Sequence, residues 1–152
     1  MLDNRKEAAL ENDRFEAYRK KFYSYLEKKR LSRTSERFAV MREVYDYGGH
    51  FDVEMLYERL KQKKYHVSRT TLYHTLELLE ECGLVCRFRP DSGGALYELA
   101  FGNAPHDHIL LPESGECIEF SDSRMEEIVR SLEAEYHVRI KGRTVIFYAE
   151  QN

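Results

Sequence analysis

The sequence predicts an α+β protein in which an N-terminal winged helix-turn-helix domain is followed by a small α/β dimerisation domain. Helical spacing of apolar residues dominates the first 83 positions, a β-hairpin pattern follows, and short strand patterns with one helix fill the rest. Three short helices followed by a hairpin are the order of a winged helix-turn-helix. The predicted parts are a helical extension plus DNA-binding domain at 1–99, a hinge at 100–105, and a dimerisation and metal-binding domain at 106–152.

The helices are predicted from periodicity and from their start and stop signals. Residues 3–30 contain neither Gly nor Pro and form one helix, or two in sequence. A second helix is expected to begin with Ser35 as N-cap and to stop at the glycine pair 48–49, and a third to start at Asp52. A fourth has Ser68 as N-cap and ends at Gly83.

The predicted strands are shorter than the helices, and those after the hinge depend on a second copy of the chain. Residues 85–89 and 95–99 are β-type runs around a turn-rich loop, so they predict a hairpin. Beyond the hinge, a sheet of three short strands with one helix has little core of its own, which favours burial against a second copy of the chain. The apolar residues expected in that interface are Ile109, Leu111, Ile118, Val145 and Phe147.

Composition narrows the class of protein. With 152 residues, 42% of them hydrophobic, the chain can bury a core of its own. Residues 1–90 hold 19 Lys and Arg against 15 Asp and Glu, whereas 91–152 hold 5 against 12, so a basic half precedes an acidic one. No run approaches the ~18 apolar residues of a membrane span, and three cysteines without a Cys-x-x-Cys pair favour reduced thiols. We therefore expect a cytoplasmic protein without a membrane partner.

The helix from Ser68 offers a polar face suited to DNA. Its first turns place hydroxyl, guanidinium and imidazole groups opposite a leucine stripe, and such groups can contact bases and phosphates of double-stranded DNA. Any amphipathic helix has a polar face, so the hypothesis depends on the surrounding order of elements. The candidate DNA-binding residues on this helix are Ser68, Arg69, Thr70, Thr71, Tyr73 and His74.

A metal site is predicted after the hinge. His106 and His108 are two positions apart on a predicted strand, so both rings lie on one face, and Glu119 lies on the next predicted strand. Imidazoles and carboxylates therefore converge. This ligand set suits Fe(II), Mn(II), Co(II), Ni(II) or Zn(II). No cysteine lies within five residues of the two histidines, which argues against a thiolate zinc cage there. A solvent-exposed histidine pair is the alternative interpretation.

Four segments follow one another in chain order from His50 to Phe120: HFDVEMLYERL, SRTTLYHTLELLEECGLV, LYEL and PHDHILLPESGECIEF. Together they resemble the ferric uptake regulator (Fur) family of bacterial metal-responsive repressors. A weaker likeness extends to RLSRTSER, which contains Arg37 as a further candidate for DNA binding, and to VRIKGRTVIFY. Most of the first 25 residues lie outside the resemblance.

The resemblance implies a homodimer that binds an inverted-repeat DNA operator when it is loaded with metal. It also implies one divalent transition metal per subunit, Fe(II) in cells, with Zn(II) and Mn(II) as alternatives and haem sensing left open. A metal held by ligands from both domains would fix the angle between them. The family's sensor ligands fall on His50, Glu98, His106, His108 and Glu119, where the family uses either or both histidines of the His-Asp-His segment.

Three departures from the family pattern stand out. The thiolate zinc of the family would need cysteines where this chain has Leu111 and Ser114, so no four-cysteine structural zinc is expected. A further family site would fall on residues of which two cannot bind a metal. The usual Tyr-Arg of the recognition helix is Tyr73-His74 here, which removes a permanent charge. The positions of that further site are Pro105, Asp107, Glu126 and Arg143.

Two rival functions remain open from the sequence. A His-x-His pair with a later glutamate also resembles the ligand set of a small β-barrel metalloenzyme, although such barrels need more strands than this chain predicts. A winged-helix regulator whose metal site is vestigial or only structural is the second alternative. Turnover would identify the former, and operator affinity that ignores metal would identify the latter. Our prediction is a regulator and not an enzyme.

Overall fold

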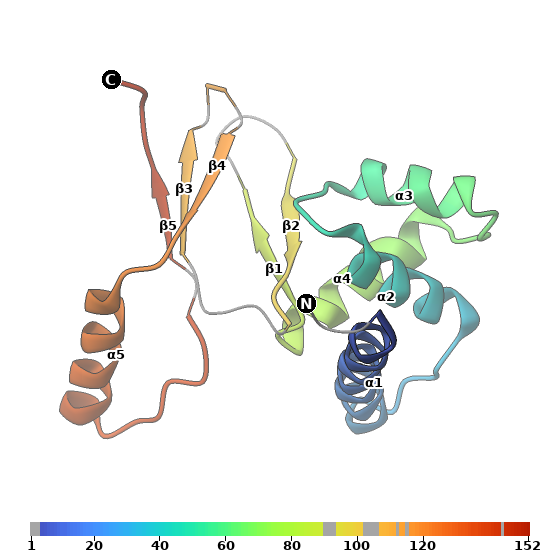
Figure 1. The fold of residues 1–152 in the computed structure, drawn as a ribbon, viewed down its shortest axis with the longest axis horizontal. Coiled ribbons are helices and arrows are strands. Elements are labelled where there is room, and N and C mark those ends of the chain that lie inside the picture. Colours follow the sequence, from blue (N-terminus) through green and yellow to red (C-terminus); the bar gives the residue numbers. More distant parts are fainter. Residues whose placement is uncertain (1–3, 90–93, 102–106, 112, 115, 144) are drawn as a thin grey trace. The chain divides into compact units, whose positions relative to one another are not determined.

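The computed structural model describes residues 4–89, 94–101, 107–111, 113–114, 116–143 and 145–152 (Figure 1). The described residues up to 101 form one compact unit and those from 107 onward form another. Helices dominate the first unit, and a small sheet with one helix makes up the second. The predicted α+β class is confirmed. The expected hinge residues 102–105, the hairpin turn 90–93 and His106 lie outside the described residues.

The N-terminal extension is one continuous helix, α1 (Asn4–Lys28). Its buried residues are spaced by three and four positions, so they form one stripe along the helix. The Tyr18 hydroxyl donates to the Met41 carbonyl oxygen at 3.0 Å. This helix is therefore part of the core of the first unit. The buried stripe consists of Phe15, Tyr18, Phe22 and Leu26.

Three shorter helices follow, and each begins at a side chain that caps its first turn. Asp52 accepts a hydrogen bond from the Met55 amide, and Ser68 accepts one from the Thr71 amide, as the sequence predicts. The prediction of Ser35 as N-cap is wrong, because the Thr34 hydroxyl accepts from the Arg37 amide and Ser35 is already helical. These helices are α2 (Ser35–Tyr47), α3 (Val53–Gln62) and α4 (Arg69–Glu81).

The hairpin of the first unit pairs β1 (Val85–Phe88) with β2 (Leu96–Leu99) in antiparallel register. A single bridge joins Phe51, just before α3, to Tyr97 of β2, with N–O distances of 3.0 and 2.8 Å. Both side chains are buried. The bridge therefore holds the segment just ahead of α3 against the hairpin.

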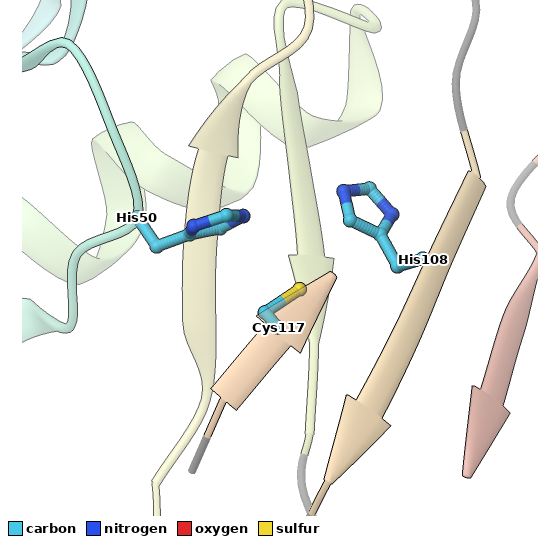
Figure 2. Close-up of side chains that lie close together, drawn as sticks. All are labelled: His50, His108 and Cys117. Carbon is cyan, nitrogen blue, oxygen red and sulfur yellow. The ribbon is translucent and has the colours of Figure 1, made fainter. Parts of the chain in front are cut away.

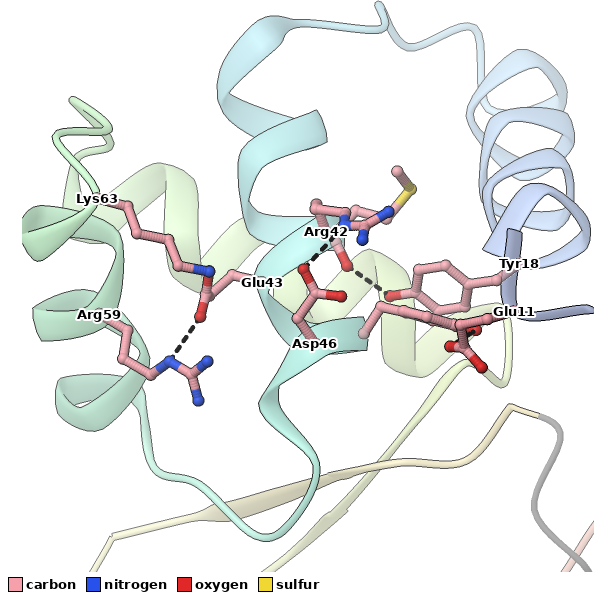
Figure 3. Close-up of polar contacts among 9 residues, drawn as sticks. Glu11, Tyr18, Arg42, Glu43, Asp46, Arg59 and Lys63 are labelled. Carbon is pink, nitrogen blue, oxygen red and sulfur yellow. Dashed lines mark hydrogen bonds and ion pairs between the residues drawn. The ribbon is translucent and has the colours of Figure 1, made fainter. Parts of the chain in front are cut away.

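A buried carboxylate joins α2 to α3 (Figure 3). Glu43 is 1% exposed, and its two oxygens lie 2.6 Å from Arg59 Nε and 2.6 Å from Lys63 Nζ. The Arg59 guanidinium also lies 4.5 Å from the centre of the Tyr47 ring. A carboxylate removed from water needs such partners to remain charged.

Replacing Arg59 by methionine is expected to lower the free energy of unfolding by about 1.5–3 kcal/mol, because Glu43 loses one of two charged partners while staying buried. Denaturant unfolding measures the change. Arg124→Met, on a side chain that is 81% exposed, is the matched control and should change it by under about 0.5 kcal/mol. Equal effects of the two substitutions would contradict a stabilising role for the buried pair.

The second unit is a mixed sheet in the order β4-β3-β5 with helix α5 (Figure 1). β3 runs antiparallel to β4 and parallel to β5, and α5 begins after the capping carboxylate of Asp122. The expected strands and helix are present. Their bounds are β3 (Asp107–Leu111), β4 (Glu116–Phe120), α5 (Ser123–Tyr136) and β5 (Ile146–Tyr148).

The second unit leaves much of its apolar surface uncovered. In α5, all of whose residues are described, no residue is buried, and Ile128, Leu132 and Tyr136 recur every fourth position while 38–63% exposed. On the sheet, Ile118 is 41% and Phe147 is 51% exposed. Large contiguous apolar patches mark interaction surfaces. Among the described helices of the chain, none is long and apolar enough to cross a membrane.

Candidate functional site

His50 and Glu98 form a polar pair in the first unit. The Phe51–Tyr97 bridge sets their backbones side by side, because each lies next to a bridged residue. His50 Nε2 is 3.3 Å from Glu98 Oε2, and the side chain of Glu98 is only 9% exposed. The two residues are 48 positions apart in the sequence, so no local spacing reveals the pair.

His108 and Glu119 form the corresponding pair in the second unit. The antiparallel register of β3 and β4 places them directly opposite each other. A nitrogen of His108 lies within 4.8 Å of a carboxylate oxygen of Glu119, and His108 is 3% exposed. Directly opposed side chains share one face of a sheet. Each unit thus supplies one imidazole and one carboxylate.

Cys117 is a candidate ligand that the sequence analysis did not identify. It lies two positions before Glu119 on β4 and opposite Leu110, so it shares the face of His108, and its Sγ lies within 4.8 Å of a nitrogen of that histidine. Figure 2 shows the side chains of His50, His108 and Cys117, each on the element that carries it. The sequence argued only against a thiolate zinc cage beside the histidines, and strand pairing brings this one cysteine close to His108 despite their separation in the sequence. The pairing register of the two predicted strands is the signal that could identify Cys117 from the sequence.

Both pairs fit a divalent transition metal. Imidazole nitrogen with carboxylate oxygen suits Fe(II), Mn(II) and Zn(II), and a nearby thiol adds a ligand that Zn(II) accepts. At the two positions where the family resemblance would place zinc-binding cysteines, Leu111 is buried and the Ser114 hydroxyl donates to the Leu111 carbonyl at 3.4 Å. Neither side chain offers a thiolate.

The candidate DNA-binding residues gather in the first unit around a groove of about 500 Å³. The N-terminal turns of α4 form one wall and the chain leading into α2 forms the other. The Arg37 guanidinium donates to the carbonyl of Ser32, in the chain leading into α2, at 2.6 Å. Of the groove residues, Arg37, Ser68, Thr70, Thr71 and His74 were predicted to bind DNA, whereas Ser32, Thr34, Glu36 and His66 were not.

Arg69 and Tyr73 do not line this groove. Arg69 donates two hydrogen bonds of 3.0 Å to the carboxylate of Glu54, and its guanidinium lies 4.1 Å from the centre of the Tyr57 ring. The pair raises the pKa of Arg69 and lowers the pKa of Glu54, chiefly through the side-chain hydrogen bonds. Tyr73 is 50% exposed, which leaves its ring available to a partner.

Comparison with known proteins agrees with this arrangement. The chain is 32% identical over 142 residues to the ferric uptake regulation protein of Campylobacter upsaliensis, across 91% of this chain and 90% of that protein. The structure of the ferric uptake regulator from Pseudomonas aeruginosa with manganese matches with a TM-score of 0.72 and 29% identity, across 86% of this chain and 97% of that one.

A second solved structure, the ferric uptake regulator of Helicobacter pylori, matches with a TM-score of 0.71 and covers 90% of this chain and 91% of that one. At 23% identity it supports the fold alone. The model of the ferric uptake regulator family matches residues 28–148. The chain therefore belongs to the ferric uptake regulator family, whose members are metal-responsive transcription regulators and not enzymes.

Proposed function

We propose that the protein is a metal-dependent repressor whose affinity for DNA is switched by one divalent transition metal per subunit. The observation that carries the proposal is that each unit holds one histidine–carboxylate pair. The ligands are His50 and Glu98 from the first unit and His108 and Glu119 from the second. Fe(II) is the proposed cellular metal, and Zn(II) and Mn(II) suit the same donors.

Metal binding by ligands from both units would restrict the angle between them. A metal bound by all four side chains binds only those arrangements in which the two pairs meet, so it shifts the population toward them. If one such arrangement also fits DNA, metal and operator bind cooperatively, and each tightens the binding of the other by the same factor.

The groove at α4 and the exposed Tyr73 are the proposed DNA-contacting surface. Serine, threonine and arginine side chains meet phosphates and base edges, and an aromatic ring can contact the thymine methyl group. A symmetric dimer would present two such surfaces to an inverted-repeat operator in the cytoplasm. The uncovered apolar residues of the second unit support that dimer, because a second copy would bury them.

The direct test is the affinity of the purified protein for DNA, measured by fluorescence anisotropy with an operator selected from random sequence. Fe(II) under anaerobic conditions, Mn(II) and Zn(II) are added separately, and a chelated sample is the reference. We expect at least one metal to tighten operator binding about 5- to 150-fold. An affinity that no metal changes would show that the metal site is vestigial or purely structural.

The dimer is expected to persist in strong chelator, because the chain lacks the cysteine pair of the family's structural zinc, with Leu111 and Ser114 in those places, and its second unit exposes apolar side chains. Sedimentation velocity at micromolar concentration measures the state. Ile118→Glu with Phe147→Glu should yield monomers, since charge replaces apolar contact, whereas Met55→Glu in the first unit should leave the dimer intact. A folded wild-type monomer in chelator would contradict this expectation.

Tyr73→Ala and Arg69→Ala are expected to weaken DNA binding in different ways. Loss of the Tyr73 ring should cost about 1–3 kcal/mol of discrimination between operator and random DNA. Loss of Arg69, a candidate phosphate contact, should lower affinity on all sequences and make the salt dependence shallower. Anisotropy on both DNAs at several salt concentrations separates the two, and identical profiles for the variants would refute the assignment.

A further inference from the structure

Arg143 lies between two carboxylates of the second unit. Its Nε and Nη2 donate to the two oxygens of Asp107 at 3.3 and 3.1 Å, and its Nη1 donates to a Glu126 oxygen at 3.2 Å. Asp107 begins β3, Glu126 lies in the first turn of α5, and Arg143 precedes β5. One guanidinium therefore connects the start of β3, the first turn of α5 and the segment ahead of β5.

The burial of Asp107 shows why a cation is needed there. Asp107 is 1% exposed, and the Arg143 side chain is 20% exposed, so the pair is largely removed from water. A buried carboxylate is costly unless a cation and hydrogen bonds compensate it. A guanidinium meets both requirements, because it is permanently charged and its planar fork matches a carboxylate.

These residues do not fit a second metal ion. Asp107 and Glu126 match two ligand positions of the further site that the family resemblance implies, but the remaining two positions are Pro105 and Arg143, and neither side chain can coordinate a metal. The two remaining carboxylates are both bonded to the guanidinium.

We propose that the Arg143 guanidinium is the built-in cation of the second unit and replaces a metal ion between Asp107 and Glu126. The second unit then assembles without a metal ion between these two carboxylates, and the subunit is expected to bind no metal ion at this position. The position is also close to the sensor ligands, because His108 follows Asp107 and its amide donates to the Val145 carbonyl at 3.1 Å, two residues after Arg143. Arg143 thus acts as a positioning residue that sets the start of β3 before metal arrives.

The test replaces Arg143 by histidine. Arg143→His places an imidazole beside Asp107 and Glu126 and so converts the cluster to a metal site. Zn(II) binding is measured by equilibrium dialysis against a competing chelator, and thermal unfolding is measured with and without Zn(II). We expect Arg143→His to bind one equivalent more than the wild type, and Arg143→His with Glu126→Gln to lose it. Metal-free Arg143→His should melt below the wild type and recover with Zn(II).

Arg139→His is the matched control, because it adds an exposed histidine in the same segment without the two carboxylates; it should bind no extra equivalent. Arg143→Lys should fold and also bind none. Glu126→Gln alone should leave the wild-type stoichiometry unchanged, and the loss of one equivalent there would overturn the proposal. A folded Arg143→His without the extra ion would overturn it too. The expected difference of one equivalent holds whether the sensor pairs bind a metal or not, so the two proposals fail separately.

Discussion

Alanine at His108 or at Glu98 is expected to remove most of the metal-dependent gain in operator affinity, about 5- to 150-fold in the wild type. Each substitution takes one ligand from one unit, so a metal that remains bound to the other unit no longer restricts both. The chelated variants should bind operator like the chelated wild type, because neither residue lines the α4 groove. Anisotropy titrations with Fe(II), Mn(II) and Zn(II) measure both quantities.

Matched controls separate the sensor ligands from ordinary surface groups. Glu116→Ala removes an exposed carboxylate from the same strand as Glu119, and His137→Ala removes an exposed histidine at the end of α5. Both should keep the wild-type metal response. If His108→Ala and Glu98→Ala keep it as well, the sensor lies elsewhere or does not exist.

Periodicity and capping chemistry predicted the helices and strands, because these signals are local. The single N-cap error shows the limit of such signals: Thr34 and Ser35 are adjacent hydroxyl residues with the same capping chemistry, and only the backbone conformation decides between them. Thr34 is extended, with φ −82° and ψ 158°, so its side chain faces the open amides.

Only part of the candidate site could be predicted, and the reason differs from that of the N-cap error. The sequence spacing of His108 and Glu119 indicated neighbouring strands, but the pairing of His50 with Glu98 depends on the Phe51–Tyr97 bridge, which no local pattern reveals. The family resemblance supplied that pair. The same non-locality hid Cys117, since strand register and not chain distance decides which side chains meet.

The contact of Arg69 with Glu54 is a surface contact that the sequence does not predict. Its place in the first turn of α4 suggested a phosphate contact, yet Glu54, 15 residues earlier, accepts both of its hydrogen bonds. A phosphate contact of Arg69 must therefore compete with the Glu54 carboxylate. Exposed ion pairs contribute little free energy, so the phosphates of a polyanion such as DNA can displace Glu54 from Arg69.

The N-terminal helix α1 should contribute to stability as a core element, although the family model begins only at residue 28. Phe22 is fully buried in the same hydrophobic cluster as residues of α2 and α4, such as Met41 and Leu76. Removing its ring leaves a cavity in a close-packed interior, and the surrounding helices can collapse into it only in part.

Phe22→Ala is therefore expected to lower the free energy of unfolding by about 3–5 kcal/mol, a large share of the ~5–15 kcal/mol typical of a domain. Urea unfolding followed by circular dichroism measures the change. Leu10→Ala on the same helix is the control: Leu10 is 59% exposed, so its truncation should cost under about 0.5 kcal/mol. If both variants unfold like the wild type, α1 is an appendage whose packing contributes nothing, and the core of the first unit is complete without it.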